Sequence, residues 1–171
     1  WLGSAAAAMT LARLSLSGRI EEPAGITVED ALGFGPWTSI FRVGRVTTIP
    51  QGFGQSPATL WAGLKALRAG RIVVINPDGE MSWDGSLPPL RPGAAWLALR
   101  SGAPLVPFVS TWGAYEAWPR WSGWPHLPGR FTVRVGRPFT LPESPAEHVD
   151  DAMIARANAI IARELQGLIY S

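Results

Sequence analysis

The 171-residue sequence contains no cysteine, only two histidines and few charged residues. Without cysteine, the chain forms neither a disulfide framework nor a metal site with thiolate ligands. The two histidines have no mutual spacing that suits zinc. Because 47% of the residues are hydrophobic and only 16% are charged, an intrinsically disordered chain is excluded. We therefore expect a folded domain with no metal ion and no cofactor.

The sequence also lacks long apolar runs and a signal peptide. No run approaches the roughly 20 apolar residues that cross a bilayer as a helix, and the Ala-rich start has no basic leader. Residue 1 is Trp, and apolar residues recur at helical spacing over 1–16 without a preceding N-cap. We expect residues 1–171 to form a single domain whose N-terminal part lies ahead of this sequence.

What is abundant is Trp, Pro, Gly and Arg, with nine Trp, 16 Pro and 19 Gly. Arg far outnumbers Lys, and its planar side chain suits phosphate groups. A GC-rich genome explains the same composition equally well. The net charge is only +2, and we expect no nucleic acid as a partner.

Helical and strand patterns alternate through most of the chain. Residues 56–70 are typical of an amphipathic helix, with Ser56 as N-cap, Pro57 at the first helical position and Gly70 at the end. Further patterns predict helices over 91–101 and 144–169, and strands over 43–49, 72–75, 103–110 and 130–142.

Continuous apolar strands between helices favour an α/β fold with a mostly parallel sheet flanked by helices. Within this sheet we expect Val73–Asn76 and Leu105–Val109 to be adjacent parallel strands. The Arg91–Ser101 helix would form the crossover between them.

The strand predicted at 72–75 runs directly into Asn-Pro-Asp-Gly-Glu at 76–80. The end of a buried strand is a rigid place for a functional carboxylate, which makes Asp78 a candidate site residue. The alternative is an ordinary turn, because Pro-Asp-Gly is a common turn sequence. Glu80 and Asp84 add two carboxylates, but their spacing lacks the oxygen ligands of a calcium loop and favours a solvated turn.

Residues 67–108 carry an ordered series of motifs. A helix and a glycine lead into the apolar strand, and Pro-Asp-Gly-Glu-Met-Ser follows at 77–82. The series continues with Gly85, Arg91, Gly93-Ala94, Leu97-Ala98 and Pro104-Leu105-Val106-Pro107. This order resembles that of the glycerolipid acyltransferase family, of the lysophosphatidate (1-acylglycerol-3-phosphate) type. With "FRVGRVTTIPQG" and "TVRVGRPFTLP", the resemblance covers the chain from Phe41 to Pro142.

The resemblance implies transfer of a fatty acyl group from a CoA or carrier-protein thioester to a lysophospholipid or related lipid hydroxyl. It also implies a peripheral protein at the cytoplasmic face of a membrane. Arginines that flank the strand end are candidates for binding phosphate groups of the substrates. The candidate catalytic residues are Asp78 and Gly79, and the candidate substrate-binding residues are Arg42, Gly44, Arg45, Arg71 and Glu80.

The sequence lacks the catalytic His-x4-Asp of the family. His126 is followed five positions on by Phe131, and His148 by Met153. We expect the motif to lie ahead of residue 1. Loss of a general base costs a factor of about 100 to 10,000, and we expect residues 1–171 alone to be catalytically dead in acyl transfer.

Two further blocks depart from the family pattern. Gly-x-x-Phe-x-x-Arg falls on Gly44, Thr47 and Pro50, so that only the glycine matches. Residues 77–82 read Pro-Asp-Gly-Glu-Met-Ser where the family has Pro-Glu-Gly-Thr-Arg-Ser. Two phosphate-binding arginines are thus absent from their usual positions, which disfavours lysophosphatidate itself as the acceptor.

Residues 112–124 support a second hypothesis. Four Trp surround Arg120 in this segment, and such a composition suits a bilayer interface or stacking on sugars. Packing of the same Trp side chains against the core is an equally good interpretation. The alternative function is therefore a non-catalytic member of the same fold that binds lipid or carbohydrate through this loop.

Overall fold

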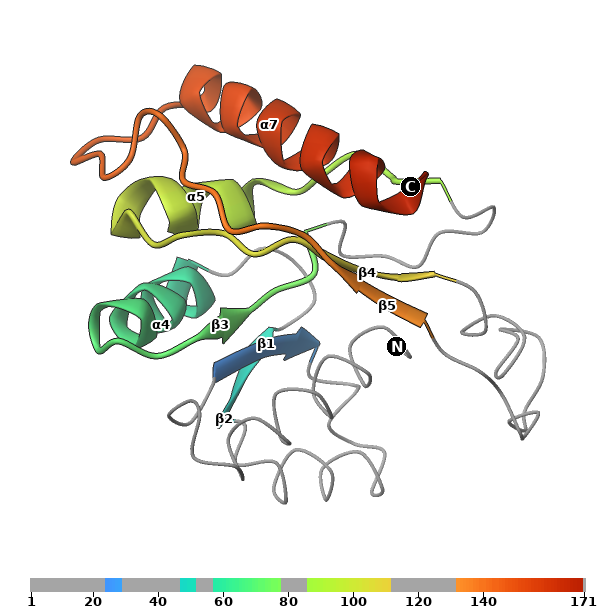
Figure 1. The fold of residues 1–171 in the computed structure, drawn as a ribbon. Helices are drawn as coiled ribbons and strands as arrows, with labels where there is room; N and C mark the ends of the chain where they lie inside the picture. Colours follow the sequence, from blue (N-terminus) through green and yellow to red (C-terminus); the bar gives the residue numbers. More distant parts are fainter. Residues whose placement is uncertain (1–23, 29–46, 52–56, 78–85, 112–131, 171) are drawn as a thin grey trace.

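The computed structural model of the chain describes residues 24–28, 47–51, 57–77, 86–111 and 132–170 (Figure 1). The helices and strands of this part are, in chain order, β1 (Ala24–Val28), β2 (Thr47–Gln51), α4 (Pro57–Arg68), β3 (Val73–Val74), α5 (Pro92–Ser101), β4 (Phe108–Thr111), β5 (Thr132–Val135) and α7 (Asp151–Ile169).

The described strands pair in two separate sheets. β1 is the central strand of a three-stranded sheet, between β2 and β3, and both of its pairings are parallel. β4 and β5 form a two-stranded antiparallel sheet. Helices and strands together confirm the α/β class. A mostly parallel sheet is not confirmed, because the described strands divide between parallel and antiparallel pairings.

The predicted pairing of Val73–Asn76 with Leu105–Val109 is wrong. β3 pairs with β1, a strand that the sequence pattern did not predict. The second segment overlaps β4, which pairs with β5 in the other sheet, and its Leu105 forms an antiparallel bridge to Phe139. The helix α5 therefore connects two sheets instead of crossing over within one.

The helix α4 begins and ends where the sequence predicts. Gly70 has φ 75°, in the left-handed region. Its N–H donates to the Leu67 carbonyl at 3.0 Å, and the Arg71 N–H donates to the Ala66 carbonyl at 3.0 Å. These two bonds satisfy carbonyls of the last turn and end the helix. Ser56, the predicted N-cap, lies outside the described residues.

The helix α5 lies between α4 and α7 and contacts both (Figure 1). Much of α5 is buried, with Ala95 at 0% and Leu99 at 1% exposure. Because alanines lie in the core on both α5 and α7, the two helices can pack closely. The central apolar cluster consists of Ala95, Ala98, Leu99, Leu141, Ala157, Ile161 and Leu165.

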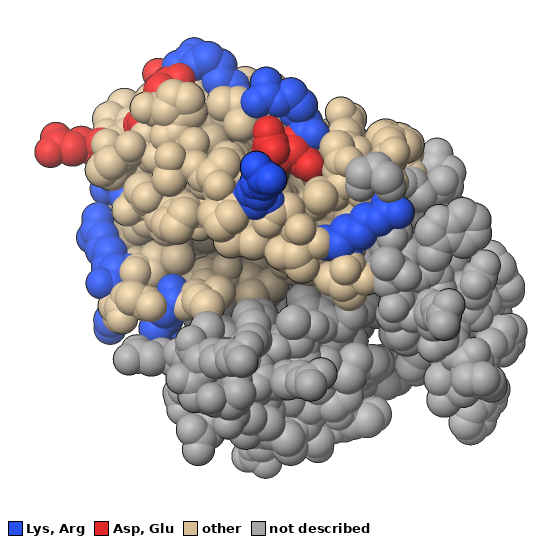
Figure 2. Space-filling model, viewed as in Figure 1, with Lys and Arg blue, Asp and Glu red and all other residues tan. Residues whose placement is uncertain are grey.

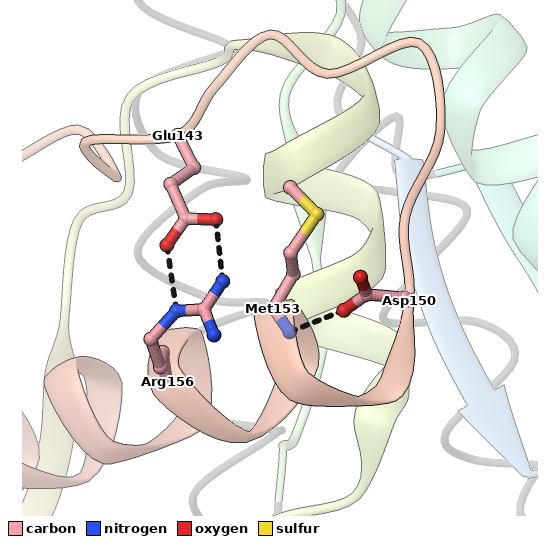
Figure 3. A network of polar contacts seen from close by, with 4 residues as sticks. All are labelled: Glu143, Asp150, Met153 and Arg156. Atoms are coloured by element: carbon pink, nitrogen blue, oxygen red, sulfur yellow. Dashed lines mark hydrogen bonds and ion pairs between the residues drawn. The ribbon is translucent and has the colours of Figure 1, made fainter.

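The helix α7 begins seven residues later than the pattern over 144–169 predicts. Asp150 is its N-cap, and its carboxylate Oδ1 accepts a hydrogen bond from the Met153 N–H at 2.7 Å (Figure 3). The preceding segment crosses the end of α5 instead, where the Ala146 N–H donates to the Leu99 carbonyl at 2.8 Å. The side-chain cap at Asp150 defines the helix start, whereas helical periodicity alone places it too early.

Glu143 and Arg156 join this preceding segment to α7. The guanidinium Nε and Nη2 atoms each donate to a Glu143 carboxylate oxygen at 2.8 Å (Figure 3). These hydrogen bonds lower the pKa of Glu143 below its usual range. A lowered pKa stabilises the fold above the unfolded-state pKa, and this contribution disappears as the pH falls through the folded-state value. Both side chains are exposed, so that the pair contributes little.

Gly136 follows β5 and lies in close contact with two neighbouring segments. Its N–H donates to the Pro107 carbonyl at 2.8 Å. A Cβ at this position would lie 2.8 Å from Pro107 Cγ and 3.2 Å from Leu168 Cδ1. We expect Gly136→Ala to lower the free energy of unfolding by about 1 to 3 kcal/mol, because overpacking forces neighbouring groups to shift. Urea unfolding measures this difference.

Gly167→Ala is the matched control for this substitution. Gly167 lies within α7, and a Cβ there would meet no atom within 4 Å. Alanine in a helix is favoured over glycine by about 1 kcal/mol, so the control should gain stability. Similar losses in both variants would contradict the proposed close contact at Gly136.

Candidate functional site

The carboxyl end of β3 and the amino end of α5 are held together. The Pro77 carbonyl, three residues after β3, accepts a hydrogen bond from the Arg91 N–H at 2.7 Å. Arg91 is also the N-cap residue of α5. The two ends of the connection that contains Asp78 are therefore joined by a hydrogen bond at the carboxyl end of the half-buried strand β3. Ligands of open α/β sheets commonly bind at such strand ends.

The first turn of α5 packs closely against this strand end. A Cβ on Gly93 would lie 3.3 Å from Leu60 Cδ2 on α4 and 3.5 Å from Ile75 Cδ1. Gly93 belongs to the motif series. Because it has no side chain, the first turn of α5 can approach Leu60 and Ile75 closely. The first turn of α5 contains no acidic residue. Because a helix N-terminus carries a partial positive charge, a negative charge that develops near it would be stabilised.

Most of the predicted site residues lie outside the part of the chain that the structure describes, and their roles stay predictions. These residues are Arg42, Gly44, Arg45, Asp78, Gly79 and Glu80.

Arg71 is the predicted site residue that the structure does describe. It is half-buried and precedes β3 by two residues. Pro77, which leads into Asp78, follows the same strand. Arg71 and Pro77 therefore lie at opposite ends of β3. The structure thus separates Arg71 from the strand end that leads to Asp78.

The central strand β1 is an element that the sequence reasoning missed. β1 and β3 are parallel neighbours, so that their carboxyl ends lie at the same edge of the sheet. Val28 ends β1, and Glu29 and Asp30 follow it directly in the sequence. These two acids lie outside the described residues. The signal for β1 was available in the sequence, since the short β-branched run at 26–28 precedes acids as the run at 72–75 does.

A shallow groove of about 380 Å³ lies beside α7. Leu87 lines one wall of the groove. In the sequence it lies two positions after residues 78–85, the part of the connection that the structure does not describe. The Asn158 amide Nδ2 donates to the Leu90 carbonyl at 3.3 Å, and its buried Oδ1 has no partner among the described residues. The groove is lined by Leu87, Pro88, Pro89, Leu90, Asn158, Ala159, Ala162 and Gln166. It offers a largely apolar surface close in sequence to the predicted site.

The described part of the chain contains neither a candidate metal site nor a candidate membrane-spanning helix. No group of three or more His, Asp or Glu residues there is placed to hold a metal ion. None of its helices combines the length and the apolar character that crossing a membrane requires.

The fold has a counterpart among solved structures, an α/β acyltransferase. The crystal structure of the 1-acyl-sn-glycerophosphate (LPA) acyltransferase PlsC from Thermotoga maritima matches with a TM-score of 0.58 and 18% sequence identity. The match covers 88% of this chain and 58% of that chain, so that the present sequence spans little more than half of its counterpart. No protein-family model and no curated protein sequence matches the chain. At this level of identity the comparison establishes a shared fold.

Proposed function

We propose that the chain is part of an acyltransferase that moves a fatty acyl group from a CoA or carrier-protein thioester to the hydroxyl of a lysophospholipid or related lipid. The enzyme would act in lipid biosynthesis, as a peripheral protein at the cytoplasmic face of a membrane. The observation that carries the proposal is the agreement between two independent comparisons. The motif order from Phe41 to Pro142 resembles the glycerolipid acyltransferases, and the fold matches a solved acyltransferase of that kind.

The arrangement around the end of β3 supports the same chemistry. In acyl transfer, a base removes the proton of the acceptor hydroxyl and the oxygen attacks the thioester carbonyl carbon. The C–S bond then breaks, and the sulfur leaves as a thiol after taking up a proton. The attack places negative charge on the carbonyl oxygen, which a nearby helix N-terminus can stabilise. The amino end of α5 is held beside the strand that leads to Asp78.

Asp78 would act by positioning the acceptor and the surrounding loops, because a general base in this family is a histidine oriented by aspartate. The 171 residues contain no His-x4-Asp, and His148 is exposed in the loop before α7. We infer that the base is supplied from outside residues 1–171. The complete polypeptide as the cell makes it is therefore the right material for an activity test.

The absence of cysteine gives a direct assay. A thiol-reactive dye added to the complete polypeptide, a long-chain acyl-CoA and a lysophospholipid would report the CoA thiol, with no contribution from residues 1–171. We expect thiol release that depends on the acceptor, together with formation of the diacyl lipid seen by mass spectrometry. The matched control omits the acceptor.

The contrary outcome has a defined meaning. If neither acyl-CoA nor acyl carrier protein yields acceptor-dependent thiol release with any lysophospholipid, the acyltransferase proposal is overturned. Lipid or carbohydrate binding without turnover would then support the alternative of a non-catalytic member of this fold.

A further inference from the structure

Among the described residues, acidic side chains are confined to one segment, whereas basic side chains occur in several. The segments 57–77 and 86–111 contain no Asp or Glu, and they hold five cationic residues. All acidic side chains of the described part lie in the segment 132–170. In Figure 2 basic side chains without acidic neighbours lie along the edge over α4, whereas acidic and basic side chains lie together on the α7 side. Among the described residues, α4 and its neighbour α5 thus carry cations and no acids.

One face of α4 combines this charge with an exposed aromatic side chain. Trp61, Lys65 and Arg68 are spaced at i, i+4 and i+7, which places them on the same side of the helix. Trp61 is 54% exposed, and both cations are exposed without an ion pair to any described residue. The rest of the outward surface of α4 is mainly alanine.

The aromatic part of this face extends onto α5. The rings of Trp61 and Trp96 are 5.7 Å apart between centroids and meet edge to face at 76°. Ile72, after the end of α4, is a further exposed apolar side chain at 39%. Two of the large exposed hydrophobics of the described part thus lie on or next to α4, beside its two cations.

Helix stabilisation explains only part of this pattern. Lys65 and Arg68 lie in the last turn, where cations interact favourably with the helix dipole. That effect requires neither an exposed Trp four residues earlier nor the absence of acids over both neighbouring segments. Indole rings, small residues and long cationic side chains together are typical of a surface that lies in the headgroup region of a bilayer.

We propose that the face formed by Trp61, Lys65, Arg68 and Trp96 binds the surface of an anionic phospholipid bilayer. The cations contact lipid phosphates, and the Trp61 ring enters the headgroup region. Charge complementarity favours an anionic surface over a zwitterionic one. The exposed indole favours a bilayer over an acidic protein as the partner. This inference rests on the membrane attachment in the proposed function and names the surface that would make it. It does not require acyl transfer, so that vesicle binding and enzyme activity can fail separately.

Vesicle co-sedimentation without any acyl donor tests the proposal. We expect the complete polypeptide to bind vesicles of phosphatidylcholine with one third phosphatidylglycerol, and to bind pure phosphatidylcholine vesicles much less. The double variant Lys65→Glu, Arg68→Glu should lower the partition coefficient for the anionic vesicles at least tenfold. Trp61→Ala should lower it at least threefold while leaving the preference for anionic lipid in place.

Two variants, one on α7 and one at its C-cap, serve as controls. Arg163→Glu changes an exposed cation, and Tyr170→Ala removes an exposed aromatic ring that is 77% accessible. Both should leave vesicle binding within twofold of the parent. If a charge reversal lowers the melting temperature, Lys65→Gln with Arg68→Gln replaces it and should still weaken binding.

Three results would overturn the proposal. The first is equal binding to neutral and anionic vesicles by the parent protein. The second is equal weakening by the α4 and α7 variants. The third is unchanged vesicle binding in the α4 variants together with lost binding to a soluble acidic protein, which would assign the face to a protein partner.

Discussion

Replacing Leu99 by alanine should lower the free energy of unfolding by about 2 to 5 kcal/mol. Leu99 lies on α5 with only 1% of its surface exposed, and it belongs to the apolar cluster that joins α5 to α7. The substitution removes buried methyl groups and leaves a cavity that close packing of two helices cannot easily fill. Urea unfolding followed by circular dichroism measures the loss.

Val106→Ala is the control for this prediction. Val106 is 49% exposed and lies outside the regular strands, so that its truncation removes little buried surface and should cost well under 1 kcal/mol. If the two variants lose the same stability, α5 does not form the centre of the core.

Replacing Asp78 by asparagine in the complete polypeptide should lower turnover at least tenfold. A tenfold loss corresponds to about 1.4 kcal/mol of transition-state stabilisation. The substitution removes the negative charge but keeps a side chain that favours turns, so that the melting temperature should change little. Acyl-CoA thiol release at saturating acceptor measures the effect on turnover.

Asp84→Asn provides the comparison, because it makes the same chemical change six positions later in the same connection. We expect it to be nearly silent in both activity and stability. Small, equal effects of the two substitutions would mean that Asp78 forms an ordinary turn and has no role in positioning the acceptor.

The elements that could be predicted from sequence are those with local end signals. α4 has proline at its first position and glycine in the left-handed region after its end, and both appear in the structure as expected. α7 was predicted too long because helical periodicity continues into residues 144–149, whereas the Asp150 cap is a single side chain. Local chemistry thus defines helix ends better than periodicity does.

Strand pairing could not be predicted in the same way, because it depends on contacts between distant segments. β1 starts with Ala-Gly, which no propensity favours in a strand, yet it is the central strand of its sheet. β3 is an edge strand of this sheet, and β4 pairs with β5 in the other one. A pattern of residues indicates that a strand exists but says little about its neighbour.

The location of the candidate site is still a prediction, although the structure shows how the elements around it are joined. The motif order located the end of β3 and the start of α5, which the structure holds together through Pro77 and Arg91. The grouping of Arg71 with that strand end relied on closeness in sequence. Because the chain is extended within a strand, the residues that precede and follow the strand in the sequence lie at its opposite ends.

The hydrogen bond between Pro77 and Arg91 also has an evolutionary consequence. Since it fixes the two ends of the connection, residues between them can be inserted, deleted or exchanged without displacing β3 or α5. The entropic cost of closing a loop rises only logarithmically with its length, by about 0.6 kcal/mol for each doubling. The length and sequence of this connection can therefore change during evolution, and substrate specificity with them, while β3 and α5 keep their positions.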